Sequence, residues 1–256
     1  MNLAIISAIL SAILYAICIP FAKMMTPYVE SITLGGLLYL GAGTGLGITQ
    51  IFAKSCSNPL SKKELPFIFA IVGLDITTIF AYVVFKERLS KKLILAVIII
   101  LTACIILTME KTEGLIFNQG SVFVLISGLC WGLENNCTRK ISSKSTKQIT
   151  AIKGICSGIG SLILAMIFKE NIPAVKYIIP ALLLGFVSYG LSVALYIYAQ
   201  RFLGAVKTGA YYSLAPFFGV IFCLVFLKEL PGLQFYIALI FMILGTFLVI
   251  RDSKNS

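Results

Sequence analysis

The sequence contains no histidine and little charge, since Asp, Glu, Lys and Arg make up only 12% of its 256 residues. The absence of histidine excludes His-ligated metal sites and catalysis by a histidine base. The scarcity of charge excludes a water-soluble domain, in which about 25% of residues are charged. The seven cysteines form no CxxC pair and fall mostly within apolar runs. We therefore expect no disulfide framework, no metal site and no cofactor.

Long apolar runs take the place of charge, and hydrophobic residues make up 59% of the chain. Each run approaches the roughly 20 residues that a helix needs to cross a bilayer. The runs are continuous and do not alternate, which predicts helices and not strands. Nine of them are found, at residues 3–22, 31–53, 65–85, 93–109, 119–138, 148–168, 177–200, 208–227 and 233–250. The predicted fold class is all-α, a polytopic membrane helix bundle.

The net charge of +11 would suggest nucleic acid as a partner of a soluble protein. Here the basic residues lie in short connections between apolar runs, as the positive-inside rule describes. The expected partners are therefore the lipid bilayer and a small solute, not nucleic acid, and a homodimer is the assembly to test. We expect a multi-pass protein of the plasma (cytoplasmic) membrane with a cytoplasmic C-terminus.

The charge distribution allows two interpretations of segment 65–85, a single crossing of the membrane or a re-entrant segment. Nine simple crossings place 13 basic residues inside and 7 outside. If 65–85 enters and leaves on the same side, both termini lie inside and the ratio becomes 15 to 5. The second arrangement fits the positive-inside rule better.

An internal repeat agrees with a shortened first half. Residues 11–16 match 127–132 at an offset of 116, whereas Lys86-Glu87 matches Lys228-Glu229 at an offset of 142. The offsets differ by 26 residues, about one helix and a turn, and the junction is placed near 73–78. The predicted division is a first repeat over 1–110, a second over 119–251 and a polar tail over 252–256, with about four and five helices.

These repeats resemble the drug/metabolite transporter superfamily, EamA type. The resemblance rests on the aromatic-small pairs Tyr15-Ala16 and Trp131-Gly132, and on apolar runs that end in Lys86-Glu87 and Lys228-Glu229 before a last helix. It implies a carrier of small organic solutes such as metabolites, amino acids or drugs, and not an enzyme. In such a carrier a solute binds between two repeats that rock to alternate access. The alternative is a shortened, non-transporting or assembly-dependent relative.

Charged residues inside the spans are the first candidates for function, because they are costly in a bilayer. Glu134 and Asn135 lie near one end of run 119–138, and Lys153 lies about two turns into 148–168. The short connection between these runs places Glu134 and Lys153 at similar depth, which predicts an ion pair. The pair is either a solute or proton site, or a structural pair. Asp75 is either a coupling-ion site or the polar turn of a re-entrant hairpin.

Aromatic residues with hydroxyl groups are the second set of candidates. Tyr189 and Ser192 share a helix face and would line a pocket or pack against a neighbour. Tyr15 and Trp131 are repeat mates that we expect at the central seam. Tyr196, near the predicted end of its helix, is assigned with Tyr198 to the interfacial aromatic belt. The small-xxx-small pairs Gly41/Gly45, Gly43/Gly47 and Gly154/Gly158 predict close helix contacts.

Overall fold

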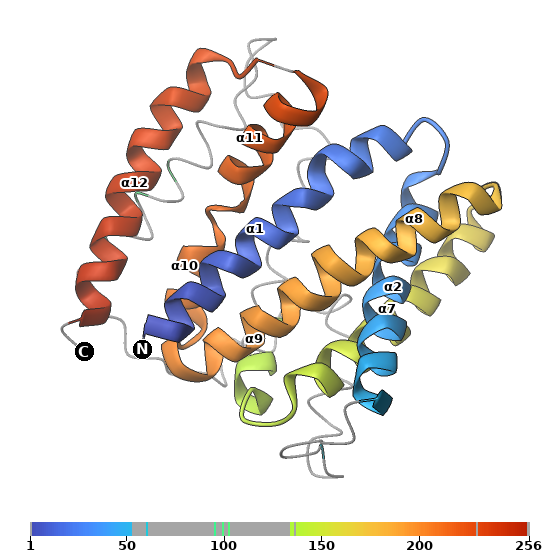
Figure 1. Ribbon diagram of the computed structural model, residues 1–256, viewed down its shortest axis with the longest axis horizontal. Helices are drawn as coiled ribbons and strands as arrows, with labels where there is room; N and C mark the ends of the chain where they lie inside the picture. The colour runs from blue at the N-terminus through green and yellow to red at the C-terminus, as the bar shows by residue number, and fades with distance from the viewer. Residues whose placement is uncertain are drawn as a thin grey trace.

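The structure is a computed structural model that describes residues 2–52, 134–135, 137–228 and 230–254, with the single positions 60, 95, 99 and 102. All regular elements in these parts of the chain are helical. They are α1 (Asn2–Met25), α2 (Ser31–Phe52), α7 (Thr146–Ile167), α8 (Val175–Gly185), the π-helical segment η2 (Phe186–Leu191), α9 (Ser192–Leu203), α10 (Ala205–Tyr212), α11 (Ala215–Leu227) and α12 (Leu233–Lys254) (Figure 1). The predicted all-α fold class is thereby confirmed.

Several sequence-based predictions fall on other residues. Segment 65–85, with Asp75 and the expected junction at 73–78, lies outside the described residues. Trp131 and the Lys86-Glu87 pair do so as well. The crossing of 65–85 and the division into repeats therefore stay predictions.

Five described helices are long and apolar enough to cross a bilayer. A helix rises 1.5 Å per residue, so about 20 residues cover the hydrocarbon core. These helices are Asn2–Met25, Ser31–Ile51, Thr146–Ile167, Val175–Leu203 and Ala205–Leu227, and α12 adds the shorter apolar stretch Phe235–Leu248. The chain is thus a multi-pass integral membrane protein.

Two of these helices depart from regular α-geometry. Between α8 and α9 the Ser192 amide donates to the Val187 carbonyl, five residues back, as in a π-helix. The second helix breaks at Ser213–Leu214, just before Pro216 in the first turn of α11. Proline has no N–H to donate to the preceding turn, which explains the break within the predicted run 208–227.

Helix α2 lies very close to α7 and α8 because glycines line the contacts. A methyl group added at Gly43 would come within 2.5 Å of the Ile155 amide nitrogen, and one at Gly154 within 2.5 Å of the Gly43 nitrogen. A methyl group added at Gly41 would clash with the Leu182 backbone, and one added at Gly45 would clash with the Phe186 ring. The expected close contacts are confirmed at these positions. Gly47 differs, because nothing lies within 4 Å of its added methyl group.

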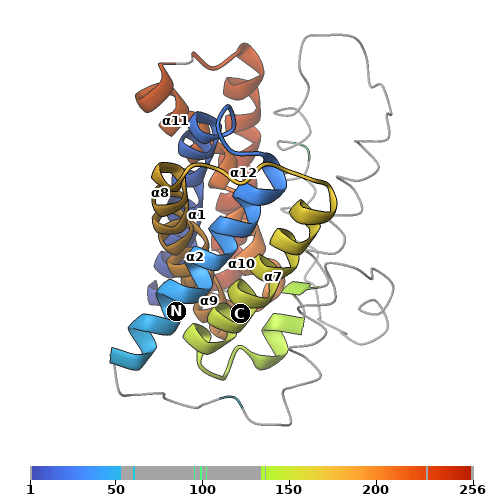
Figure 2. The same cartoon turned by 90° about the vertical axis from the view of Figure 1, so that its right-hand side faces the viewer.

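Helices α1 and α2 both pack against the long helix formed by α8, η2 and α9. Helix α1 packs on α9, α10 and α11, whereas α2 packs on α7, α8 and η2 (Figures 1 and 2). Among the described residues, the first two helices are thus held mainly by helices from the second half of the sequence.

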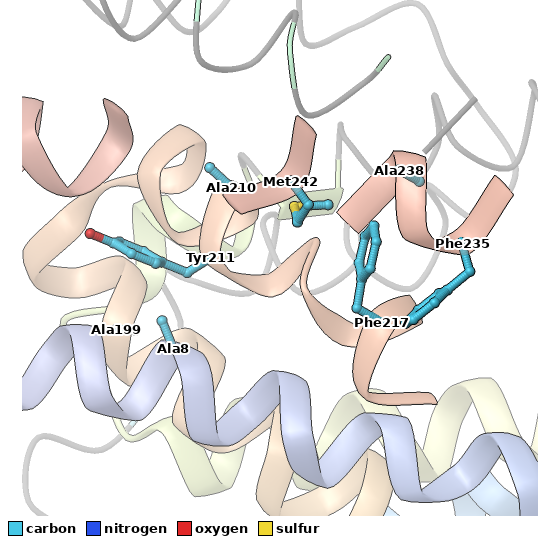
Figure 3. Packing of buried hydrophobic residues seen from close by; sticks show 8 residues of the cluster. All are labelled: Ala8, Ala199, Ala210, Tyr211, Phe217, Phe235, Ala238 and Met242. Carbon is cyan, nitrogen blue, oxygen red and sulfur yellow. The ribbon is translucent and has the colours of Figure 1, made fainter. Parts of the chain in front are cut away.

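The apolar core between α1 and α12 is built from small and aromatic residues. Phe217 of α11 and Phe235 of α12 have ring centroids 5.8 Å apart, and the fully buried Met242 follows along α12 (Figure 3). Ala8 of α1 belongs to the same cluster as Tyr211 of α10 (Figure 3). Alanines allow close helix approach where lipid supplies no hydrophobic driving force.

The loops that end α1 and α7 are joined by carboxylates. Glu170 accepts hydrogen bonds from the Ile32 amide at 3.1 Å and from the Thr33 amide and hydroxyl, each at 2.7 Å. Glu30 accepts in return from the Asn171 amide and side chain, at 3.0 and 2.8 Å. We call this set the loop clamp. Desolvation raises the pKa of Glu170, but these hydrogen bonds outweigh it and leave that pKa below its ordinary value.

The loop clamp lies at the end of the bundle opposite the two chain ends. In Figure 1 the N- and C-termini lie close together at the lower left, with the 139–147 connection at the same lower end. The loops after α1 and α7 lie at the upper right. One end of the bundle therefore carries both termini and the 139–147 connection, and the other end carries the loops after α1 and α7.

Candidate functional site

Glu134 and Lys153 form the predicted ion pair, with Glu134 Oε2 2.9 Å from Lys153 Nζ. The two side chains are 7% and 12% exposed. The other carboxylate oxygen, Oε1, accepts a hydrogen bond from the Thr138 hydroxyl at 2.6 Å. Both carboxylate oxygens therefore have a partner, which is what a buried charge requires.

The connection between the two charged residues is short and firmly held. Helix α7 begins after Ser145, whose hydroxyl accepts from the Gln148 amide as an N-cap. Arg201 of α9 donates to the Ser142 carbonyl at 2.6 Å and to the Lys144 carbonyl at 2.7 Å. These contacts fix the loop that determines the depth of Glu134 relative to Lys153.

The site lies about two turns inside the bundle. Lys153 follows the first residue of α7 by seven, Tyr196 precedes the last residue of α9 by seven, and Tyr212 follows the first residue of α10 by seven. Seven residues of helix correspond to about 10 Å. The three residues therefore lie at the same depth in the bundle. This depth is between the membrane surface and the midplane, which lies about 15 Å below the surface.

A small cavity of about 30 Å³ lies beside the ion pair. Its polar wall comes from the helix that ends at 141 and from α7, and its aromatic wall from α9 and α10. The residues around it are Glu134, Asn135, Thr138, Lys153, Val193, Tyr196, Ile197 and Tyr212. The volume admits at most about two water molecules.

A row of five tyrosines leads away from this cavity. Successive ring centroids are 4.9 Å apart for Tyr196 and Tyr212, 5.4 Å for Tyr212 and Tyr15, 5.5 Å for Tyr15 and Tyr189, and 5.1 Å for Tyr189 and Tyr39. We call these residues the tyrosine row. Tyr15 lies 13 residues after the start of α1, about 20 Å along the helix. The row therefore extends from the cavity toward the middle of the bundle.

Two buried polar side chains near the cavity, Gln200 and Ser192, each donate a hydrogen bond to another helix. Gln200, fully buried, donates from Nε2 to the side-chain oxygen of Asn135 at 2.9 Å. Ser192, also fully buried, donates to the Ser11 carbonyl of α1 at 2.8 Å. Of the two interpretations of Ser192, its contact with α1 agrees with packing against a neighbouring helix.

The structure brings together most of the residues predicted from the sequence. Glu134, Asn135 and Lys153 line the cavity, and Tyr15 and Tyr189 belong to the tyrosine row. Among the described residues, no three Cys, Asp or Glu side chains gather as a metal site would require. Asp75 and Trp131 are not among the described residues. The functional roles of all these residues stay predictions.

Tyr196 corrects the sequence analysis. It was assigned to the interfacial belt, but it is only 5% exposed and lines the cavity. The assignment was wrong because the helix continues to Leu203, three residues past its predicted end, so Tyr196 lies about two turns from the helix end and not about one. Thr138 was missed, although its spacing of four from Glu134 already places these two residues on one helix face.

A buried ion pair beside a small cavity, within a bundle of helices long and apolar enough to cross a bilayer, places the chain among polytopic membrane proteins. The sequence model of the EamA-like transporter family matches residues 118–251, more than half of the chain. The chain belongs to the EamA-like transporter family.

The other comparisons agree with this assignment. An uncharacterized transporter of Methanothermobacter thermautotrophicus (strain Delta H) is 27% identical over 232 residues, which cover 88% of this chain. The chain spans 63% of the length of that relative. A protein of known crystal structure is similar with a TM-score of 0.73 and 16% identity, over 96% of this chain and 94% of the other. That likeness supports the fold alone.

Proposed function

We propose that this protein carries a small organic solute, such as a metabolite, an amino acid or a drug, across the plasma membrane by alternating access between its two repeats. The observation that carries the proposal is the buried Glu134–Lys153 pair, which lines a small cavity whose other wall, Tyr196 and Tyr212, begins the tyrosine row. Charged side chains inside a bilayer usually face a substrate or ion pathway. The tyrosine rings offer an amphipathic surface to a solute that is partly apolar.

The orientation is proposed from the charges at the two ends. The end with both termini carries four basic residues in 139–147, two in 201–207 and two in 251–256. The end with the loop clamp carries one in 23–30, two in 169–176 and one in 228–232. We propose that the end with the termini is cytoplasmic.

Reconstituted vesicles test the carrier proposal. Purified protein is placed in proteoliposomes loaded with a panel of unlabelled amines, amino acids and organic acids, and counterflow of the matching labelled solutes is measured. We expect at least one solute to exchange, and Glu134→Gln to abolish that exchange. Glu30→Gln is the matched control, because it changes a carboxylate of the loop clamp and should leave exchange near the wild-type rate.

A second function, a shortened relative that does not transport, is favoured by one observation, that the repeat offsets of 116 and 142 leave the first repeat about 26 residues shorter than the second. A chain that moves none of the panel, and whose melting temperature no panel member raises, would support this alternative.

A further inference from the structure

We infer that Lys153 is a built-in counter-ion, whose ammonium group occupies on Glu134 the place that the cationic amine of a solute takes. The inference rests on the proposed function and adds the chemical class of the solute, an amine with an aromatic or apolar body. Four steps support it, from the occupancy of the carboxylate to the place where each freed charge would go.

The first step is the occupancy of Glu134. One carboxylate oxygen accepts from Thr138 at 2.6 Å, and the other lies 2.9 Å from the Lys153 ammonium. Thr138 is a neutral donor, whereas Lys153 brings the positive charge that balances Glu134. A solute ammonium that pairs with this buried carboxylate would therefore have to replace Lys153 as its counter-ion. Lys153 and a solute amine would thus compete for one position.

The second step is the size of the cavity. Organic ligands bind in pockets of about 300–1,000 Å³, and this cavity measures about 30 Å³. A solute therefore needs a side chain to leave. Lysine is the wall residue best able to do so, because its charge is carried on four flexible methylene groups.

The third step compares where each charge goes when the pair separates. Lys153 is about 10 Å from the start of α7, so its long stem allows the ammonium to turn toward that end of the helix and water. Glu134 has a short side chain tied to Thr138 and would stay buried. A solute carboxylate that took Lys153 would leave Glu134 unpaired, which is costly in a bilayer, whereas a solute amine on Glu134 leaves no unpaired buried charge.

The fourth step is the remaining wall. Tyr196 and Tyr212 present aromatic rings, with centroids 4.9 Å apart, to the same cavity as the carboxylate. Aromatic faces attract cations and not anions. Beyond them, the fully buried Gln200 has a side-chain oxygen without a hydrogen-bond donor. With Lys153 withdrawn, the described wall keeps one carboxylate and two aromatic rings, which favour a cation, beside the apolar Val193 and Ile197.

The test measures binding to the purified full-length chain with three probes that share one ring: phenethylamine, phenylacetate and 2-phenylethanol. Titration calorimetry is done at neutral pH on the wild type, Lys153→Met and Lys153→Gln. Removal of the tethered competitor should tighten phenethylamine binding at least about tenfold in Lys153→Met. Lys153→Gln, which keeps a neutral donor near Glu134, should give a smaller gain and serves if Lys153→Met does not fold. The double variant Glu134→Gln with Lys153→Met should show no gain.

Three results would overturn the inference: unchanged or weaker phenethylamine binding in both lysine variants, an equal gain for phenylacetate or 2-phenylethanol, or a loss of phenylacetate binding with Lys153. The last would assign Lys153 to a solute anion. Because calorimetry measures equilibrium binding and the vesicle assay measures transport, the two results can succeed or fail independently. A selective amine gain without exchange would refute only the carrier proposal, and exchange without an amine gain would refute only the counter-ion.

Discussion

Glu170 Oε2 accepts two hydrogen bonds from Thr33, one from its amide and one from its hydroxyl, each at 2.7 Å. The two residues are 137 positions apart in the sequence. Glu170 thereby caps the first turn of α2 from the loop after α7, a role that a residue of the preceding loop usually fills. Glu30, the residue before α2, turns instead to Asn171. The loop clamp thus holds the α1–α2 connection to the second half of the chain.

The first prediction concerns pH. The pKa of Glu170 is lowered from 4.5 in the folded protein, so its contribution to stability is present above 4.5 and is lost as pH falls through the lowered value. Glu170→Gln should lower the melting temperature at pH 7, and the difference from wild type should shrink toward zero in strong acid. Thermal unfolding in detergent between pH 7 and pH 3 measures this difference.

A different carboxylate controls for acid effects elsewhere in the chain. The control variant is Asp252→Asn, which changes a carboxylate in the C-terminal part of α12. A Glu170→Gln difference that stays constant down to pH 3 would contradict the capping role.

The second prediction concerns the glycine contacts of α2. Gly43→Ala and Gly154→Ala should each destabilise the protein by about 1–3 kcal/mol, because the added methyl group meets backbone atoms that cannot turn away. Gly47→Ala and Gly160→Ala are the matched controls, since nothing lies within 4 Å of a methyl group added there. Equal losses at all four positions would show that glycine flexibility, not helix proximity, matters at these sites.

These contacts show which parts of the structure the sequence could predict. The ends of the apolar runs differ from the ends of the described helices by only a few residues, because the thickness of a bilayer fixes the length of a crossing helix. The spacing of Glu134 and Lys153 across a short loop predicted their pairing. The partners of α1 and α2 could not be predicted, because helices that are apolar all round have no polar face to orient them. Tyr196 was assigned to the wrong environment because its depth depends on where α9 ends, and the apolar run placed that end three residues too early.

The third prediction concerns the energetics of the buried pair. Glu134→Gln or Lys153→Met alone leaves one buried charge without its partner and should cost about 3–5 kcal/mol. The double variant should lose less than either single one, because no unpaired charge remains. A double-mutant cycle on unfolding free energies measures the coupling, and additive losses would mean that the two charges do not depend on each other.

The fourth prediction concerns Tyr212, whose ring contacts both Tyr15 and Tyr196. Tyr212→Leu removes an aromatic face from the cavity and should raise the KM for an amine solute roughly two- to thirtyfold, the range of cation–π energies. Tyr212→Phe keeps the ring and should stay near wild type. If Phe and Leu weaken transport equally, the hydroxyl and not the ring is the contact that matters.

The fifth prediction concerns orientation. With the seven native cysteines replaced, single cysteines are introduced at Ser143, in the basic 139–147 connection, and at Ile172, which is 92% exposed in the loop after α7. The excess of basic residues at the end with the termini predicts that this end is cytoplasmic. A membrane-impermeant thiol reagent should therefore label Ile172→Cys in intact cells, and Ser143→Cys only after lysis. The reverse pattern would invert the bundle, so that the cavity and Glu134 would lie nearer the outer surface than the cytoplasmic one.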